Sequence, residues 1–305
     1  MKRTLLLLTV LLAGLSLSAE EYDLQAIYEQ IDDAIDHSPE YVADYERQIE
    51  DKRLQYVKAT APEEKYQLAF ELYERYKAFM NDSALYYIDE AEQWAIRQNQ
   101  WDRAGNCRVL RAFQCSTVGY YSEALAFLKT VNKNQLDSIG LKNYYMTQMH
   151  VYGELGYYSK IRSMQEQYFK LQTTYRDSLF AQMDHQDPDY LMYRIQELKA
   201  HQQLEEGRRL SDQWVRNTSP DSRDYAIACY YRWLVSEDQD EMRYWLSQSA
   251  LSDVRHAVMD QASLLQLADL LNGEGDLERS YKYIRFTWDC NNRFNTRMRS
   301  WQITP

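Results

Sequence analysis

The stretch "NGEGDLERSYKYI", residues 272–284, combines two glycines and an acidic residue with apolar or small residues at helical spacing. Such a stretch is typical either of a phosphate-binding loop or of the turn between two helices. A phosphate-binding loop would follow a strand and, in its commonest form, carry a lysine directly after its last glycine; neither feature is found here. We therefore predict that one helix ends at Gly275 in a left-handed turn and that Asp276 caps the next helix. The buried stripe of that next helix is expected to contain Leu277, Ser280 and Ile284.

The same pattern recurs along the chain. "VGYYSEALAFLKTV" (118–131), "LGYYSKIRSMQEQY" (155–168) and "EGDLERSYKYIRFT" (274–287) each place a small or apolar residue three positions after an aromatic residue or leucine. Fainter copies bring the positions of this kind to six, namely Ala84, Ala124, Ile161, Gly207, Met242 and Ser280. They lie 40, 37, 46, 35 and 38 residues apart, which is about the length of two helices and two turns. The chain is therefore predicted to be all-α, a solenoid of about six helical hairpins.

These units resemble the tetratricopeptide repeat (TPR). The second unit matches its glycine-x-aromatic-x-x-alanine core at Gly119, Tyr121, Ala124 and Leu128, and the last unit matches at Ala268, Leu271, Gly275, Leu277 and Ile284. The third unit has Gly156 and Tyr158 at the same positions. Four units depart from the alanine of the repeat, at Ile161, Gly207, Met242 and Ser280. The resemblance covers most of residues 65–290 and implies a right-handed solenoid that binds its partner on a concave face.

A closer resemblance lies in "NDSALYYIDEAEQWA" (81–95), "LSQSALSDVRHAVMDQASLLQLADLLNGEGDLERSYKYI" (246–284) and "DCNNRFNTRMRSWQI" (289–303). These segments resemble an exported TPR family of Gram-negative gut-type bacteria, known as domain of unknown function family 6377. The resemblance implies a signal peptide, a periplasmic helical-repeat sensor, one membrane helix and a cytoplasmic regulatory part. This chain stops at Pro305, before any membrane helix, so we expect the sensor portion of a longer, membrane-tethered chain, as a truncated gene or an expressed fragment, or else a soluble relative.

The first residues have the pattern of a secretory signal. Lys2 and Arg3 precede an apolar run from Leu5 to Leu15, and small residues follow. We predict a signal peptide over residues 1–19, with an uncleaved membrane anchor as the alternative, and we expect the protein to be exported and periplasmic. Residues 20–62 contain two helical patterns that either cap the first repeat or pair with a partner's helix. Residues 63–305 form the predicted repeat domain.

The composition argues against several classes of function. The chain carries a net charge of −11, and loss of the signal makes it more acidic, so its overall field does not favour nucleic acid or anionic lipid. The four cysteines form no C-x-x-C pair and are expected to be small core residues; a Cys229–Cys290 bridge is the alternative.

The sequence contains little that would support catalysis. The five histidines form no metal-binding motif, and no cysteine has a neighbouring histidine or other base. The acids of "DHQDPD" (184–189) could hold calcium or zinc, but they also suit a hairpin loop in which Pro188 stops one segment and acids begin the next helix. We expect a protein that is not an enzyme, with no catalytic residue, no bound metal and no cofactor.

The 27 tyrosines are the strongest compositional outlier, and many come in adjacent pairs. We expect one member of each pair in the core and the other half-exposed, with some on the concave face, where rigid amphipathic rings bind peptides or sugars. In TPR-like units the first helix of each hairpin faces the groove. The resemblance therefore places the following residues on that face: Tyr66, Tyr73, Tyr76, Asn106, Phe113, Asn143, His150, Gln196, Lys199 and Tyr231.

Taken together, these features predict a binding protein. The leading hypothesis is the ligand- or protein-sensing periplasmic domain of a signalling protein, in which a ligand in the groove changes the curvature or the dimer contacts. The alternative is a free-standing periplasmic scaffold for envelope proteins or glycan uptake. The expected partner is a protein or peptide, or a glycan, with a homodimer as a further possibility.

Overall fold

The computed structural model describes residues 22–185 and 187–294, and in this part of the chain it contains helices and no strand. An N-terminal pair, α1 (Leu24–Asp36) and α2 (Ser38–Lys58), precedes the repeats. The six hairpins are α3 (Pro62–Tyr76) with α4 (Asn81–Arg97), α5 (Trp101–Thr117) with α6 (Tyr121–Lys129), α7 (Ser138–Tyr158) with α8 (Arg162–Phe180), α9 (Pro188–Ala200) with α10 (Leu204–Asn217), α11 (Asp224–Leu234) with α12 (Gln239–Arg255), and α13 (Ala262–Glu274) with α14 (Leu277–Phe294). A short 3-10 helix, η1 (Lys133–Gln135), links α6 to α7. The prediction of an all-α solenoid of six hairpins is confirmed.

The turn at residues 272–284 is the predicted elbow. Gly275 is left-handed, with φ of 90°, and the next backbone N–H, that of Asp276, donates to the Leu271 carbonyl at 3.0 Å, which closes the end of α13. The Asp276 carboxylate accepts from the Arg279 backbone N–H at 3.2 Å and so caps α14. Gly119 makes the same left-handed turn between α5 and α6. Only in these two hairpins does a left-handed glycine lie between the helices, which is why their repeats match the TPR pattern best.

One part of the predicted buried stripe is wrong. Leu277 is 63% exposed because it is the first residue of α14 and points away from α13. Ser280 is buried as expected, and its hydroxyl donates to the Ala268 carbonyl at 2.9 Å. The buried face then continues through Tyr283 and Thr287, at the spacing of three and four residues that one helix face requires.

The third repeat was aligned wrongly. Gly156 and Tyr158 belong to the end of α7 rather than to a turn, and Ile161, at the N-cap of α8, is 64% exposed instead of buried like Ala84 and Ala124. Gly156 is needed for packing: a Cβ at this position would lie 2.6 Å from the ring of Phe169 on α8. Because a packing glycine and a turn glycine look the same in sequence, the alignment placed the second helix of this hairpin too early.

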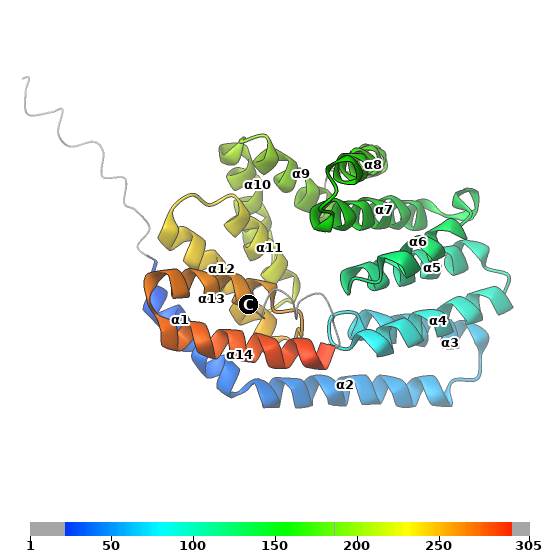
Figure 1. Cartoon of the computed structure of the whole chain (residues 1–305). Coiled ribbons are helices and arrows are strands. Elements are labelled where there is room, and N and C mark those ends of the chain that lie inside the picture. Colours follow the sequence, from blue (N-terminus) through cyan, green and yellow to red (C-terminus); the bar gives the residue numbers. More distant parts are fainter. Residues whose placement is uncertain (1–21, 186, 295–305) are drawn as a thin grey trace, which may run out of the picture.

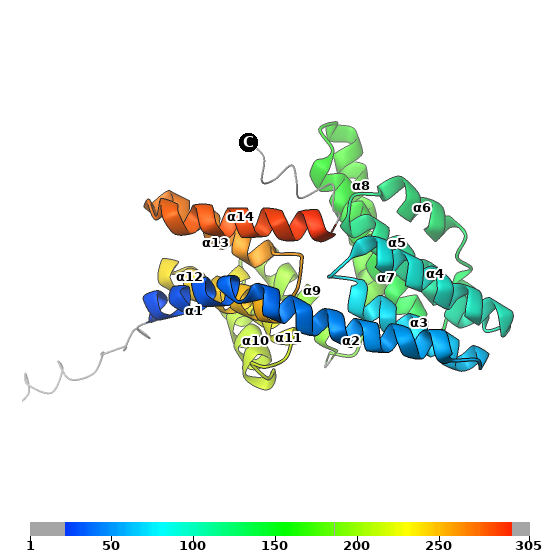
Figure 2. The ribbon, with the colours of Figure 1, turned by 90° about the horizontal axis from the view of Figure 1, so that it is seen from below.

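The N-terminal pair connects the two ends of the solenoid. α1 buries Ile27, Tyr28 and Ile31 against α12, α13 and α14, in the last two hairpins. α2 then runs to the first hairpin, where Ile49 and Tyr56 pack with the core of α3 and α4. Figures 1 and 2 show α2 extending from the side of α12 and α14 to α3. α2 thus covers the first repeat, as a cap would, whereas α1 packs against the last repeats.

Direct contacts between the first and last hairpins complete this closure. The Met259 backbone N–H, in the loop after α12, donates to the Ala78 carbonyl after α3 at 2.9 Å. The Arg293 guanidinium on α14 lies 5.3 Å from the centre of the Phe79 ring and pairs with Glu46 on α2. Cys290 and Phe294 of α14 belong to the same apolar cluster as the first hairpin. The two ends of the solenoid are therefore in contact with each other.

The junction between the third and fourth hairpins is looser. The backbones of α7 and α8 stay further from α9 and α10 than those of any other consecutive hairpins. Side chains fill the junction, with Met149, Leu179, Met183 and Tyr193 at its centre. Unbranched methionines adapt to changes in packing, so this junction can change its angle more easily than the others.

Two further expectations concern whole-chain properties. The predicted signal peptide lies outside the described residues. Within residues 22–294, apart from residue 186, no helix is long and apolar enough to cross a membrane.

All four cysteines are buried and free, which confirms their prediction as core residues and leaves no Cys229–Cys290 bridge.

Two glycines of the sixth hairpin allow a matched test of the elbow. Gly275→Ala is expected to lower the free energy of unfolding by about 1–2 kcal/mol, because an L-residue is strained in the left-handed region. Gly273→Ala, two residues earlier and inside α13, is expected to raise it by about 0.5–1 kcal/mol, because the added methyl group meets no atom within 4 Å. Urea denaturation of both variants measures the difference. Equal effects of the two substitutions would contradict this assignment of the turn.

Candidate functional site

The predicted concave residues of the first hairpin are buried. Tyr73 is 1% exposed, and Tyr66 and Tyr76 are almost as deeply covered. The Tyr76 ring stacks on Tyr87 of α4, with centroids 5.5 Å apart and an angle of 5° between the rings. Burial raises the pKa of Tyr73, as expected for a phenol far from water. The prediction that these rings are free to bind a ligand is wrong, because neighbouring helices cover them: Tyr76 packs on α4, and Arg103 of α5 lies over the Tyr66 ring at 4.8 Å.

The other predicted positions contact one another across neighbouring hairpins. The Asn143 side-chain amide donates to the Asn106 side-chain oxygen at 2.9 Å. The Gln196 amide donates to the Tyr231 hydroxyl at 2.7 Å, and the Lys199 ammonium donates to the Leu234 carbonyl. These groups occupy equivalent positions in consecutive repeats, so each is placed to contact the next. These positions were predicted to line an open groove, but their polar groups are engaged with the neighbouring hairpin.

His150 and Phe113 make a similar contact. Their rings lie 5.0 Å apart, and the His150 Nδ1 is 2.9 Å from the Ser116 hydroxyl. Burial lowers the pKa of His150, since the protonated ring would lose its hydration. The neutral imidazole is therefore a packing and hydrogen-bonding group within the repeat stack.

The adjacent tyrosine pairs divide as predicted. Tyr87 is buried and Tyr86 is 56% exposed, and Tyr144 and Tyr231 are likewise more deeply buried than their neighbours. Two pairs are exceptions: Tyr157 and Tyr158 are both exposed at the end of α7, and Tyr120 and Tyr121 are both half-buried.

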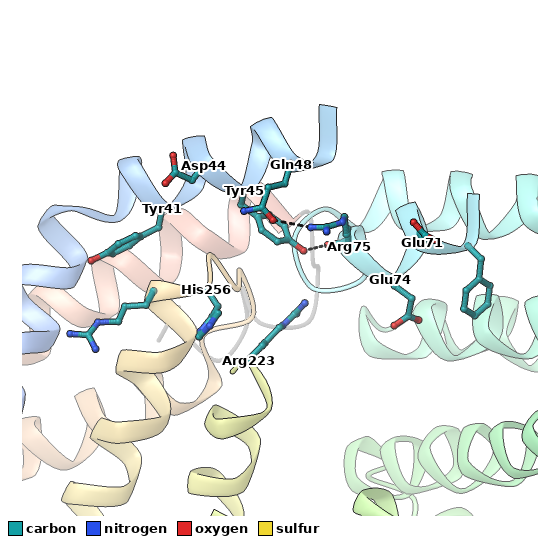
Figure 3. Close-up of a pocket in the computed structure, with 11 residues that line it drawn as sticks. Tyr41, Asp44, Tyr45, Gln48, Glu71, Glu74, Arg75, Arg223 and His256 are labelled. Carbon is teal, nitrogen blue, oxygen red and sulfur yellow. Dashed lines mark hydrogen bonds between the residues drawn. The ribbon is translucent and has the colours of Figure 1, made fainter. Parts of the chain in front are cut away.

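A cavity of about 690 Å³ lies where the ends of the solenoid meet, and we refer to it as the seam pocket (Figure 3). It is bounded by α2, by the second half of α3, and by the start of α11 and the end of α12. Its volume is within the range of about 300–1,000 Å³ that is typical of small-molecule sites. The lining residues are Tyr41, Asp44, Tyr45, Gln48, Phe70, Glu71, Glu74, Arg75, Arg223, Arg255 and His256.

α2 supplies one wall of the seam pocket. Tyr41, Tyr45 and Gln48 are spaced four and three residues apart, so they share one face of the helix. The Tyr45 hydroxyl donates to the Arg75 carbonyl at the end of α3 at 2.7 Å, and the Arg75 Nη1 donates to the Gln48 Oε1 at 3.1 Å. These two hydrogen bonds, visible in Figure 3, fix the wall against the first hairpin.

The opposite wall comes from the fifth hairpin. Arg223 stands at the N-cap of α11, and its guanidinium is close enough to the Tyr45 hydroxyl to influence its pKa. Burial raises the pKa of Tyr45, and the charges of Arg223 and Arg75 oppose that rise. His256, at the C-cap of α12, is fixed by contacts of its Nδ1 with the Ser252 carbonyl at 2.8 Å and of its Nε2 with the Asp221 carbonyl at 3.2 Å. Tyr45 therefore holds α2 against the first hairpin and lies near Arg223 of the fifth.

Only a weak signal for this pocket is present in the sequence. The heavily charged second helical pattern of residues 20–62 was predicted to be a cap, although Tyr41, Tyr45 and Gln48 form an aromatic and polar stripe along it. No local pattern indicates that α3 and α11 approach this stripe, because residues about 150 apart in sequence must meet.

The acidic stretch at 184–189 forms a loop that leads into a helix, which was the alternative to a metal site. The Asp187 carboxylate accepts from the Asp189 backbone N–H at 3.0 Å and caps α9. The Lys142 ammonium lies 2.9 Å from the Asp187 carboxylate and 3.1 Å from that of Asp189. In the part of the chain that the structure describes, no group of three or more histidine, cysteine or acidic side chains is arranged to hold a metal ion.

Comparison with known proteins agrees with this architecture. The sequence profile of the family described as SusR N-terminal TPR domain matches residues 35–305. A search of curated proteins finds no match. The TPR resemblance is thereby confirmed, whereas the closer resemblance to family 6377 stays a prediction. TPR-type helical repeat domains are generally non-catalytic binding modules that mediate protein interactions. With its fold and with a match over nearly all of its repeats, the chain belongs to the SusR N-terminal TPR domain family.

Proposed function

We propose that this chain is the sensing domain of an exported, periplasmic regulatory protein and that it binds a small ligand in the seam pocket. The observation that carries the proposal is the position of the pocket, where α2 meets the first and fifth hairpins. The predicted concave positions do not compete with it, since their polar groups are paired with neighbouring repeats.

A ligand in this pocket would act on the closure of the solenoid. It would add contacts between α2, α3 and α11, which are otherwise linked there through Tyr45. The two halves of the solenoid also meet at the methionine-rich junction between the third and fourth hairpins, which is able to adjust. A ligand in the seam pocket would therefore favour one angle between the two halves of the solenoid. A sensor requires such a ligand, one that binds one conformation of the protein more tightly than the other.

The proposal can be tested by a thermal-shift screen of neutral oligosaccharides, acidic oligosaccharides and short peptides on the purified chain. A specific ligand at a hundred times its Kd is expected to stabilise the protein by about 2.7 kcal/mol. Tyr41→Ala should weaken binding, because Tyr41 lines the pocket. Tyr86→Ala, an exposed tyrosine outside the pocket, is the matched control and should bind normally.

Hydrogen exchange gives a second readout of the same complex. The amides of α2 are expected to exchange more slowly when the ligand is bound, because α2 forms one wall of the site. A ligand that binds Tyr41→Ala as well as the unchanged chain would show that its site lies elsewhere. If no small ligand binds, the alternative of a periplasmic scaffold for envelope proteins or glycan uptake is favoured, and the partner is then a protein.

A further inference from the structure

We infer that the ligand of the seam pocket is a short anionic oligosaccharide, whose carboxylate or sulfate group is bound by Arg223 and Arg255. This inference rests on the proposed function, and it names the chemical class of the ligand. It comes from the balance of charges in the pocket, from the position of Arg223 and from the limited space.

The acids that line the pocket are already neutralised by bases outside it. Glu71 pairs with Lys52 at 2.7 Å, Glu74 pairs with Lys77 at 2.6 Å, and Asp44 pairs with Arg47. Each of these bases lies on the same hairpin or on α2, and none of them lines the pocket. The carboxylates therefore contribute little net negative charge to the space inside.

The arginines of the pocket are not neutralised in this way. Arg75 contacts the neutral amide of Gln48, and Arg223 contacts the phenol of Tyr45. Neither Arg223 nor Arg255 has a carboxylate within ion-pair distance among residues 22–185 and 187–294. In a chain of net charge −11, Arg75, Arg223 and Arg255 thus face one cavity without an acidic partner among the residues that the structure describes.

The position of Arg223 is unusual for a structural arginine. Arg75 and Arg255 lie in the last turns of α3 and α12, where a positive charge is favourable to the helix dipole. Arg223 instead stands at the N-cap of α11, where the dipole disfavours a cation and no side chain caps the helix. A bound anion would balance both the positive charge of the Arg223 guanidinium and the partial positive charge at the start of α11.

The remaining lining residues favour a sugar over a peptide. Tyr41 and Phe70 are partly exposed, and aromatic rings of this kind pack against the apolar faces of sugars. An extended peptide would need amide side chains along several repeats to hold its backbone. The amides at those positions, including Asn106, Asn143 and Gln196, are hydrogen-bonded within the protein. A cavity of about 690 Å³ also limits the ligand to a few sugar rings.

Guanidinium groups suit this ligand because their planar fork binds carboxylate or sulfate oxygens with two parallel hydrogen bonds. Lysine would bind the same charge with less geometric preference. Arg223→Lys is therefore expected to recover only part of the affinity that Arg223→Gln loses.

The experiment is isothermal titration of the purified chain with four probes: trigalacturonic acid, the 4-sulfated chondroitin disaccharide, neutral galactotriose and triglutamate. The uronate and sulfate probes separate the two sources of charge, and triglutamate presents carboxylates without sugar rings. We expect at least one anionic sugar to bind about ten-fold or more tightly than galactotriose. Arg223→Gln and Arg255→Gln should each reduce that affinity about ten-fold, and rising salt should weaken it. Arg209→Gln, an exposed arginine of α10 outside the pocket, is the control and should bind normally.

The possible failures are distinguishable. If galactotriose binds as tightly as the anionic sugars, and Tyr41→Ala weakens it while Arg223→Gln does not, the pocket is the site but the anionic ligand is wrong. If triglutamate binds and no sugar does, the ligand is an acidic peptide and the oligosaccharide is wrong. If neither these probes nor the wider thermal-shift screen yields a ligand that depends on Tyr41, the proposed function fails, and this inference fails with it.

Discussion

Arg232→Ala is expected to lower the free energy of unfolding by about 3–5 kcal/mol, as measured by urea denaturation. Arg232 is 4% exposed, and its guanidinium pairs with Asp212 on α10 and Glu241 on α12. It also donates to the Ser236 hydroxyl at 2.9 Å. Removal of the arginine leaves Glu241 as a buried carboxylate without its counter-ion, and this loss of compensation dominates the effect.

Two control variants separate this mechanism from a general effect of losing an arginine. Arg209→Ala, on the exposed surface of α10, should change the free energy of unfolding by less than about 0.5 kcal/mol. The double variant Arg232→Met with Glu241→Gln should be less destabilised than Arg232→Ala, because no buried charge then remains unpaired at Glu241. A double variant as unstable as the single one would show that packing, rather than charge, determines the effect.

Tyr73→Ala is also expected to lower the free energy of unfolding by about 3–5 kcal/mol. Tyr73 is among the largest fully buried side chains of the described chain and lies in the cluster that joins α2, α3, α4 and α5. Truncation to alanine would leave a cavity at the point where the N-terminal pair covers the first hairpin. Circular dichroism during urea denaturation measures the change.

Tyr86→Ala is the matched control for Tyr73→Ala. Tyr86 is exposed on α4, so its loss should change the free energy of unfolding by less than about 0.5 kcal/mol. Any loss of ligand binding by Tyr73→Ala should therefore follow its loss of stability and be absent at temperatures where the variant is folded. A folded Tyr73→Ala protein of normal stability that no longer binds ligand would restore the original prediction of a concave binding residue.

The hairpins could be predicted because their signals are local. A glycine such as Gly119 or Gly275 indicates a turn. The alanine or serine that follows it at a fixed spacing indicates the close approach of two adjacent helices. At Gly156 the same local signal gives a wrong alignment, because there the absence of a Cβ allows two helices of one hairpin to pack closely. In the fourth hairpin the left-handed turn is made by Gln202, with φ of 59°, so the repeat looked faint although its geometry is the same.

The candidate site could not be predicted because it depends on contacts between distant segments. The stripe of Tyr41, Tyr45 and Gln48 resembles any polar helix face until α3 and α11 are placed beside it. At the predicted concave positions, sequence alone did not indicate that the side chains of Asn106 and Asn143 would form a hydrogen bond with each other. Burial of Tyr66 and Tyr76 likewise depends on how α3 packs against α4 and α5.

The docking of α1 has a consequence for biosynthesis. Asp32 on α1 pairs with Arg279 on α14, which lies 247 residues later in the chain, and Tyr28 accepts a hydrogen bond from Tyr283. α1 is thus synthesised well before the α14 residues with which it pairs. Until the sixth hairpin is made, the apolar face of α1 lacks these partners, so a nascent chain arrested before that hairpin should expose α1 to proteases.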